Sequence, residues 1–360
     1  MNWCFVYQHY VTGGLETYVL RMCKYLNNKN DSVVLVCNSV SEVMKLQYLE
    51  AGAKIEYFKE WDRKQIARKL DELIDIFISF GLSDYYLIGK YSKHALSLMY
   101  CVHPSHLTMD DRKLSFIEVL KKPVFYRIIK SGLKNNTLLM MDENISDAIL
   151  NKYKLKVKPS AILRLPYEPA SQVKKWAEIS KKPYTVLTIC RADFPFKSYV
   201  LGLVDAIESI NKKRIVAELT IVSYGKDLDI IKKRISGKSY IKLIQETKYD
   251  DLENLYLSSD IYVGMGSTAI EAAKYGLPVI LANVNSPDFL SCGFFCDNPQ
   301  AIGEFDTDGI DGYKLLTELL KMDRDMFINL ADNCKNVFDN NYDMGLFINH
   351  IRGVVKNASN

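Results

Sequence analysis

The chain has 360 residues, of which 48% are hydrophobic and 25% are charged, and its formal net charge is +4. This length exceeds one ordinary hydrophobic core and fits two domains of common size, while the composition is typical of a folded soluble protein. The net charge is too small to indicate nucleic acid, so we predict no nucleic-acid partner.

The cysteines and histidines do not form a metal-ligand pattern. Several of the eight cysteines fall inside apolar strand-like runs, where they resemble small core residues of a protein from a reducing compartment. Cys292 and Cys296 form a CxxxC pair without a second ligand pair nearby. We therefore expect no metal and no cofactor.

No charged leader with an apolar region precedes the first predicted strand at Trp3, and no apolar run approaches the roughly 20 residues that span a bilayer. The sequence therefore predicts a cytoplasmic protein.

The first half of the chain alternates short β-branched apolar runs with amphipathic stretches, which predicts strands and helices in turn. The predicted strands cover residues 3–7, 32–38, 54–58, 75–80, 97–103, 137–142 and 160–166. The predicted helices between them cover residues 15–26, 41–52, 63–73 and 144–155. This alternation predicts a parallel sheet covered on both faces, with ligands gathering at the carboxyl ends of the strands.

Two features lie at such strand ends. Gly13 and Gly14 directly precede the first predicted helix, and without a Cβ they would let the backbone approach a ligand closely. An ordinary strand-to-helix turn explains the pair equally well. His103 ends a predicted strand and is open to a structural or a functional role.

The segment 112–134 is strongly basic. Apolar and aromatic residues are interleaved with seven basic residues and one acid, Glu118. The basic residues are Arg112, Lys113, Lys121, Lys122, Arg127, Lys130 and Lys134. Such a segment can lie on an anionic membrane surface. The alternative is a pair of surface helices divided by Pro123, with their apolar side buried in the domain.

The strand-helix rhythm restarts in the second half. A polar stretch over 167–182 predicts a linker, with the domain boundary near 170–183. We predict two doubly wound Rossmann-like α/β domains, 1–170 and 183–341, which face each other across a cleft. An amphipathic helix in 342–360 is expected at the C-terminus, where it can fold back onto the first domain.

Residues Ile261–Ala282 predict a strand, a glycine-containing turn, a short helix and a second strand. The backbone amides at Gly266, Ser267 and Thr268 would then favour an anion above the sheet edge. Glu271 has two interpretations. It can complete a capping box with Thr268, or it can accept the ribose hydroxyls of a nucleotide.

Arg191 and Lys197 flank the loop after the first strand of the second half. A guanidinium and an ammonium that converge on one site suit a diphosphate, although solvated surface positions explain the pair as well.

The order of these parts resembles the retaining glycosyltransferases of family 4, which have the GT-B fold. The resemblance runs from Gly13 to Val279 and rests on the glycine pair, His103, Arg191 with Lys197, and the stretch ST-x-x-EA-x-x-x-GLPVI that begins at Ser267. It implies transfer of a sugar from a UDP- or GDP-linked donor, with retention of configuration and without a metal.

The resemblance also implies a role for each matched residue. Catalysis would involve His103 beside the transferred sugar, and Arg191 with Lys197 on the leaving diphosphate. Donor binding would involve Gly13, Gly14, Gly266, Ser267 and Thr268 at the phosphates and Glu271 at the ribose. No enzymic nucleophile is implied, because a phosphate oxygen of the donor would take the acceptor's proton.

Two departures from the family pattern leave the donor sugar unpredicted. An apolar residue, Val263, stands where the family often has a first glutamate, and NVNSPDFLSCG replaces the usual glycine-rich stretch at 283–293. Val263 makes a non-catalytic sugar-nucleotide-binding subunit an alternative. A sugar-nucleotide epimerase, which has the same two-domain plan, is a second one, although Val263 removes one of the carboxylates that it would need. For the acceptor, the basic segment 112–134 suggests a glycan or lipid-linked molecule of bacterial surface polysaccharide synthesis, met at the inner face of the cell membrane.

Overall fold

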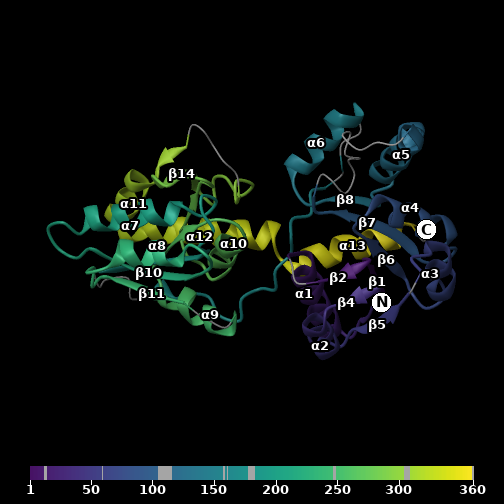
Figure 1. Cartoon of the computed structure of the whole chain (residues 1–360), viewed down its shortest axis with the longest axis horizontal. Helices are drawn as coiled ribbons and strands as arrows, with labels where there is room; N and C mark the ends of the chain where they lie inside the picture. The colour runs from purple at the N-terminus through teal and green to yellow at the C-terminus, as the bar shows by residue number, and fades with distance from the viewer. Residues whose placement is uncertain are drawn as a thin grey trace. The chain divides into compact units, whose positions relative to one another are not determined.

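The computed structural model describes residues 1–11, 14–58, 60–103, 116–156, 159, 161–176, 183–245, 249–303 and 309–358. The chain forms two compact units, shown in Figure 1. Unit 1 consists of Met1–Glu168 together with Tyr342–Asn360, and unit 2 consists of Pro169–Asn341. Each unit is described by itself.

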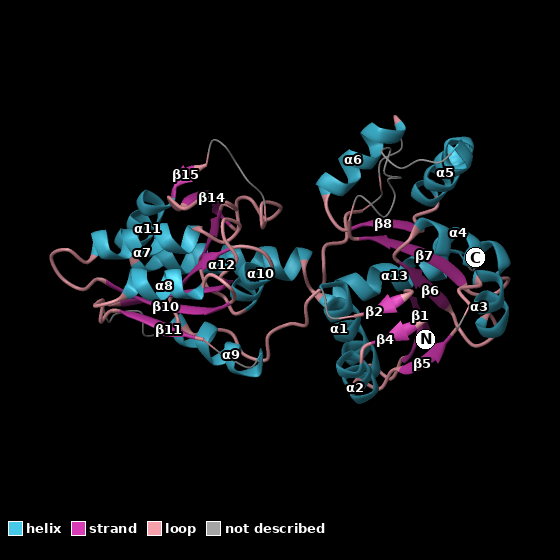
Figure 2. Ribbon diagram, viewed as in Figure 1, coloured by secondary structure: helices cyan, strands magenta, loops and turns pink. Residues whose placement is uncertain are grey.

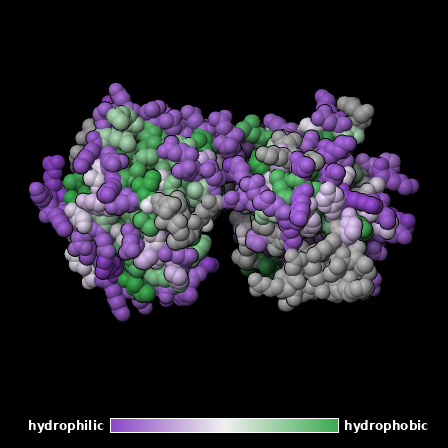
Figure 3. All heavy atoms as spheres, turned by 90° about the horizontal axis from the view of Figure 1, so that it is seen from above, coloured by the Kyte–Doolittle hydropathy of each residue, from purple (hydrophilic) through white to green (hydrophobic). Residues whose placement is uncertain are grey.

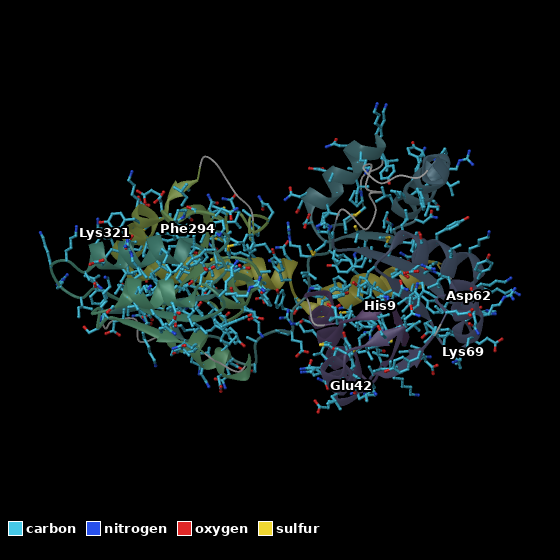
Figure 4. The ribbon with its side chains drawn as sticks, in the orientation of Figure 1. His9, Glu42, Asp62, Lys69, Phe294 and Lys321 are labelled. Carbon is cyan, nitrogen blue, oxygen red and sulfur yellow. The ribbon has the colours of Figure 1, made fainter. Side chains whose placement is uncertain are left out.

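Unit 1 contains a six-stranded sheet with parallel neighbours throughout. In spatial order its strands are β5 (Lys54–Tyr57), β3 (Ser32–Cys37), β1 (Asn2–Val6), β6 (Ile76–Ser79), β7 (Leu96–Cys101) and β8 (Leu138–Met140). A separate short ladder pairs β2 (His9–Tyr10) with β4 (Ser39–Val40). In this ladder His9, labelled in Figure 4, places its Nδ1 2.9 Å from Ser39 Oγ.

Helices cover both faces of this sheet, because successive side chains of each strand point to opposite sides. In β1, Trp3 and Phe5 belong to one apolar cluster, whereas Cys4 and Val6 belong to another. The first cluster includes buried side chains of α1 (Gly14–Asn28), α2 (Glu42–Glu50) and α13 (Met344–Ala358). The opposite face is covered by α3 (Arg63–Leu70), α4 (Leu82–Tyr91), α5 (Phe116–Lys134) and α6 (Glu143–Tyr153).

The helix α13 is the last element of the chain, yet its apolar side belongs to the core of unit 1. Phe347 and Ile351 are buried in the same cluster as Trp3 and Phe5 of the first strand. In Figure 1 this helix, in yellow, lies beside the purple and blue elements that open the chain. The two ends of the sequence therefore complete one hydrophobic core.

Unit 2 contains a seven-stranded sheet. In spatial order its strands are β11 (Ile241–Ile244), β10 (Ala217–Tyr224), β9 (Tyr184–Arg191), β12 (Ile261–Gly264), β13 (Val279–Ala282), β14 (Leu290–Phe294) and β15 (Ile310–Asp311). The first five strands are parallel, whereas β14 and β15 run antiparallel to their neighbours. Phe294 at the end of β14 is labelled in Figure 4.

The helices of unit 2 pack on the two faces of its sheet. One apolar cluster joins the strands to α7 (Tyr199–Ile210), α8 (Leu228–Ile235), α11 (Gly312–Lys321) and α12 (Arg324–Asn341). Two further helices, α9 (Tyr249–Ser258) and α10 (Ser267–Lys274), also pack against the strands. Tyr256 of α9, for example, lies with its ring 5.9 Å from that of Tyr262 in β12. The predicted fold class, a doubly wound α/β plan used twice, is confirmed (Figure 2).

Two local predictions are wrong. No strand forms over the described part of 160–166, where Ile162 makes only an isolated bridge with Met140. The helix α5 runs through Pro123 without dividing there. Proline removes a helical hydrogen bond at a cost of about 3 kcal/mol. Packing of Ile128, Ile129 and Leu133 into the apolar cluster of unit 1 offsets this loss.

Within the described residues, no helix has both the length and the apolarity required to cross a bilayer. The same part of the chain contains no group of three potential metal ligands among its His, Cys, Asp and Glu side chains. On the face seen in Figure 3, hydrophilic residues are interspersed with smaller hydrophobic groups over both units.

Asp71 is a buried carboxylate that organises the turn between α4 and β7. It accepts hydrogen bonds from the amides of Lys93, His94 and Ala95 and from the Ser92 hydroxyl. Although burial opposes ionisation, these donors lower the pKa of Asp71 to about 2.

Replacing this carboxylate should destabilise unit 1. We expect Asp71→Asn to lower the free energy of unfolding at pH 7 by about 1–3 kcal/mol, since it removes hydrogen bonds to a charged acceptor. A carboxylate with a depressed pKa stabilises the fold above its unfolded pKa, near 4, and that stabilisation is lost as the pH falls towards 2. Urea titrations should therefore show wild type and variant converging between about pH 4 and pH 2; a gap that persists at pH 2 would contradict this.

Candidate functional site

The candidate site of unit 2 lies where the direction of chain progression reverses. From β9 the chain continues to β10 and β11 on one side and then returns to β12 on the other side of β9. Ligands of open parallel sheets bind at such a switch point, outside the carboxyl ends of the strands. The carboxyl end of β9 is Arg191, and β12 ends at Gly264, directly before the turn into α10.

A cavity of about 250 Å³ lies at this switch point. It is lined by four of the predicted site residues: Arg191, Lys197, Ser267 and Thr268. Residues separated by more than 70 positions in the sequence are thus brought together by the pairing of β9 with β12.

Lys197 supplies a partly buried cation to this cavity. Burial, together with the nearby Arg191, lowers its pKa, while Cys190 acts in the opposite direction. Among the described residues no carboxylate forms an ion pair with its ammonium group, which stacks instead 5.4 Å from the ring centre of Phe196. A partly buried cation without a carboxylate partner attracts an anion more strongly than a fully solvated one does.

Arg191 carries the second cation, and its side chain is 61% exposed. Its Nη2 lies 3.0 Å from Asp193, whose carboxylate also lies 2.9 Å from Lys226 Nζ. The hydrogen bond and charge of Lys226, followed by those of Arg191, lower the pKa of Asp193. Arg191 is therefore held by an exposed ion pair, a contact of small energy that an incoming phosphate can replace.

The turn before α10 brings backbone close to Lys197. Gly266 is the N-cap of the helix and has a φ of 69°, a left-handed conformation that favours glycine. A Cβ at Gly266 would stand 4.0 Å from Lys197 Nζ. The Gly266 amide donates to the carbonyl of Ile302, whereas the amides of Ser267 and Thr268 have no hydrogen-bond acceptor among the described residues. The latter two are the donors that the first turn presents.

The predicted capping box of Thr268 and Glu271 is wrong. Because Gly266 caps the helix, Thr268 lies inside the first turn, and no side chain caps this helix start. The Thr268 hydroxyl instead accepts a 2.6 Å hydrogen bond from Tyr262. The predicted N-cap, Thr268, lies two residues too late, because Gly266 with its positive φ ends the turn and caps the helix.

Glu271 is buried and does not line the described cavity. The Tyr256 hydroxyl donates to its Oε2 over 3.5 Å and lies 3.2 Å from the carbonyl of Thr268. Val263, at the position of the family's first glutamate, is fully buried in the core cluster of unit 2. Its side chain fills the core and contributes nothing to the polar lining.

The predicted residues of unit 1 lie after the carboxyl ends of its strands. Gly14 begins α1 and is exposed, and no described atom lies within 4 Å of where its Cβ would stand. Gly13 lies outside the described residues. His103 follows β7 and is exposed, and its carbonyl lies 3.3 Å from the thiol of Cys101.

The lining of the cavity includes residues that the sequence did not single out. Among them are Asp193, Phe196, Tyr224 and Met265. The first two lie inside the segment RADFPFK between the predicted cations, so the segment itself was a signal for them. Tyr224 ends the neighbouring strand β10, which only the pairing of β9 with β10 places beside Arg191.

Comparison with known proteins agrees with this location. Residues 172–292 match the family model of the glycosyl transferases group 1. The matched segment lies within unit 2. This segment contains Arg191, Lys197 and the whole of α10. The predicted glycosyltransferase resemblance is confirmed at this level, whereas the narrower assignment to family 4 stays a prediction. A search of the curated proteins finds no match.

Solved structures with the GT-B fold resemble the whole chain. A glycosyltransferase from Rickettsia africae aligns with a TM-score of 0.67 at 15% identity, covering 99% of this chain and 98% of its own. Anabaena HepE, solved with UDP-glucose, gives 0.59 at 12% identity, with coverage of 100% and 99%. The lipopolysaccharide outer core galactosyltransferase WaaB gives 0.60 at 14% identity, with coverage of 99% and 100%. At these identities the likeness shows that the chain has the GT-B fold.

Proposed function

We propose that the protein is a retaining, metal-independent glycosyltransferase that moves a sugar from a UDP- or GDP-linked donor to a glycan or lipid-linked acceptor. The observation that carries this proposal is the convergence of Arg191, Lys197 and the first turn of α10 on one cavity at the switch point of unit 2. Two cations and unpaired helix amides are complementary to a diphosphate. The match of this segment to the glycosyl transferases group 1 supports the reaction class.

In the proposed reaction, the bond between the sugar and the diphosphate loosens as negative charge builds on the leaving phosphate. Arg191 and Lys197 stabilise that charge, and the amides of Ser267 and Thr268 hold the phosphate in place. An oxygen of the leaving phosphate takes the proton of the acceptor hydroxyl as the new glycosidic bond forms. No enzymic nucleophile is required in this scheme.

The remaining roles are proposed from the family resemblance. Glu271 would bind the ribose, which requires its contact with Tyr256 to change, because the carboxylate is buried in this structure. Gly13 and Gly14 would face the diphosphate, and His103 the transferred sugar. Among the structurally similar proteins, HepE was solved in complex with UDP-glucose, and WaaB is a lipopolysaccharide outer core galactosyltransferase. These support a nucleotide-sugar donor and an acceptor in surface polysaccharide synthesis, met by a peripheral protein at the cytoplasmic face of the membrane.

The experiment that tests the reaction class is a thermal-shift screen across UDP- and GDP-sugars, followed by incubation of the stabilising donor with and without glycan acceptors. A donor at 100 times its dissociation constant should stabilise unit 2 by about 2.7 kcal/mol. Transfer that requires an acceptor and retains the anomeric configuration supports the proposal. Conversion of the donor without an acceptor would identify an epimerase, and binding without turnover on any acceptor would identify a binding subunit.

A further inference from the structure

A second and larger cavity lies in unit 1, away from the sheet edge to which the proposed reaction is assigned. Its volume is about 770 Å³. Ala95, Leu96 and Ser97 at the start of β7 and Thr137 just before β8 contribute to its wall. These positions lie at the amino ends of parallel strands. The predicted substrate residue His103 follows the opposite, carboxyl end of β7, so a ligand in this cavity would not be a reactant of the proposed transfer.

The other walls are formed by α4 and α5, which share an apolar cluster. Tyr86 on α4 and Val124 on α5 line the cavity and are 37% and 46% exposed. Ile128, one turn further along α5, lies at the buried side. An aromatic ring and two aliphatic side chains thus provide an apolar surface that continues from the opening into the interior.

Two cations, Lys90 and Arg127, line the same cavity. No acid occurs among the described residues that line it, and neither cation forms an ion pair with a carboxylate in the described part of the chain. Three of the lining hydroxyls are already engaged, since Tyr85 and Thr137 hydrogen bond to each other at 2.6 Å and Ser97 donates to the Tyr85 carbonyl at 2.9 Å. The two cations are the charged groups that the described lining offers to a polar ligand.

Size, polarity and charge together define the class of ligand. A cavity of several hundred Å³ with mostly apolar walls and a few polar groups is the usual form of a small-molecule site. We infer that this cavity binds an anionic amphiphile, whose acidic headgroup is held by Lys90 and Arg127 and whose apolar chain lies along Tyr86, Val124 and Ile128. The exposed apolar residues at the opening allow the chain to enter from a lipid surface.

This site involves part of the basic segment 112–134. Side chains of four of its basic residues, Arg112, Lys113, Lys121 and Lys122, lie outside the described residues. Of the other three, Arg127 lines the cavity, while Lys130 and Lys134 lie further along α5 and do not. Arg127, together with Lys90, would thus bind the headgroup, whereas Lys130 and Lys134 would act only through their charge on an anionic surface.

The test is isothermal titration of the full chain with decyl phosphate below its micellar concentration. We expect saturable binding of one molecule, with inorganic phosphate and decanol each at least about tenfold weaker, because each offers half of the contacts. Replacing both cations (Lys90→Gln with Arg127→Gln) should weaken decyl phosphate binding by at least about tenfold. The matched control Lys134→Gln, on the same helix and outside the cavity, should leave it unchanged.

A second variant tests the location without altering charge. Ser131 lines the cavity from an exposed position of α5, so Ser131→Trp should fill the space and abolish binding without disturbing the core. Equal binding of inorganic phosphate, or binding that survives both the double variant and Ser131→Trp, would overturn the inference. Donor binding measured on the same variants should be unchanged, which separates this inference from the proposed function.

Discussion

Replacing Lys197 by Ala is expected to lower the rate of sugar transfer by about 10²–10³-fold, the effect of removing one group that stabilises charge developing in a transition state. Lys197 is partly buried beside the carboxyl end of β9, and this burial lowers the pKa of its ammonium group. A charge in such an environment interacts more strongly with a leaving phosphate than the same charge in water. Because the diphosphate is more negative in the transition state than in the donor, turnover should fall more than donor affinity.

The measurement is steady-state transfer from the donor that the thermal-shift screen identifies. Lys197→Met keeps most of the apolar stem against Phe196 while removing the charge, so it should resemble Lys197→Ala in rate and the wild type in stability. Lys212→Ala, an exposed lysine just after α7, provides the matched control and should retain wild-type turnover. Near-wild-type rates in both Lys197 variants would refute the assignment of this cavity to the leaving diphosphate.

We expect Arg191 to contribute little to the stability of the unliganded protein. In the reaction it should stabilise the leaving phosphate about as much as Lys197 does. The exposed ion pair of Arg191 with Asp193 must be exchanged for the phosphate, and such pairs are worth about 0–1 kcal/mol.

Sequence reasoning found Arg191 and Lys197 through their position around RADFPFK. It could not find the pairing of Asp193 with Lys226, because that contact depends on the register between β9 and β10.

The fold was more predictable than the site because each strand can be recognised from the pattern of its own residues. In β1, every residue from Trp3 to Val6 is apolar, which is the pattern of a strand buried on both faces of a parallel sheet. A helix start, in contrast, depends on a single backbone angle. The N-cap of α10 is Gly266, which has a positive φ, and not Thr268. The pattern of side chains does not distinguish these two positions.

Burial was also harder to predict for charged residues than for apolar ones. Glu271 resembles an accessible carboxylate in the sequence, yet on α10 it is buried and accepts a hydrogen bond from Tyr256. The cavity between α4 and α5 had no sequence signature, because Lys90 and Arg127 line one cavity only through the packing of two helices that are separated in the chain. Long-range packing, rather than local propensity, decided these features.

Replacing Phe347 by Ala should destabilise unit 1 by about 3–5 kcal/mol, the usual effect of deleting a buried aromatic side chain. Phe347 is 4% exposed, and its ring lies 5.2 Å from that of Tyr100 and 6.2 Å from that of Tyr18. These partners belong to β7 and α1, so the side chain joins the end of the chain to its first half. The loss should therefore fall on unit 1, although α13 follows unit 2 in the sequence.

Hydrogen exchange monitored separately in the two sheets distinguishes this outcome from general instability. In Phe347→Ala, amides of β1 and β7 should exchange faster, whereas amides of β9 and β12 should keep wild-type protection. The control is Leu346→Ala on the same helix: Leu346 is 51% exposed, so its truncation should change stability by no more than about 0.5 kcal/mol. Equal effects of the two substitutions, or loss of protection in β9 and β12, would show that α13 does not stabilise unit 1 through its buried side.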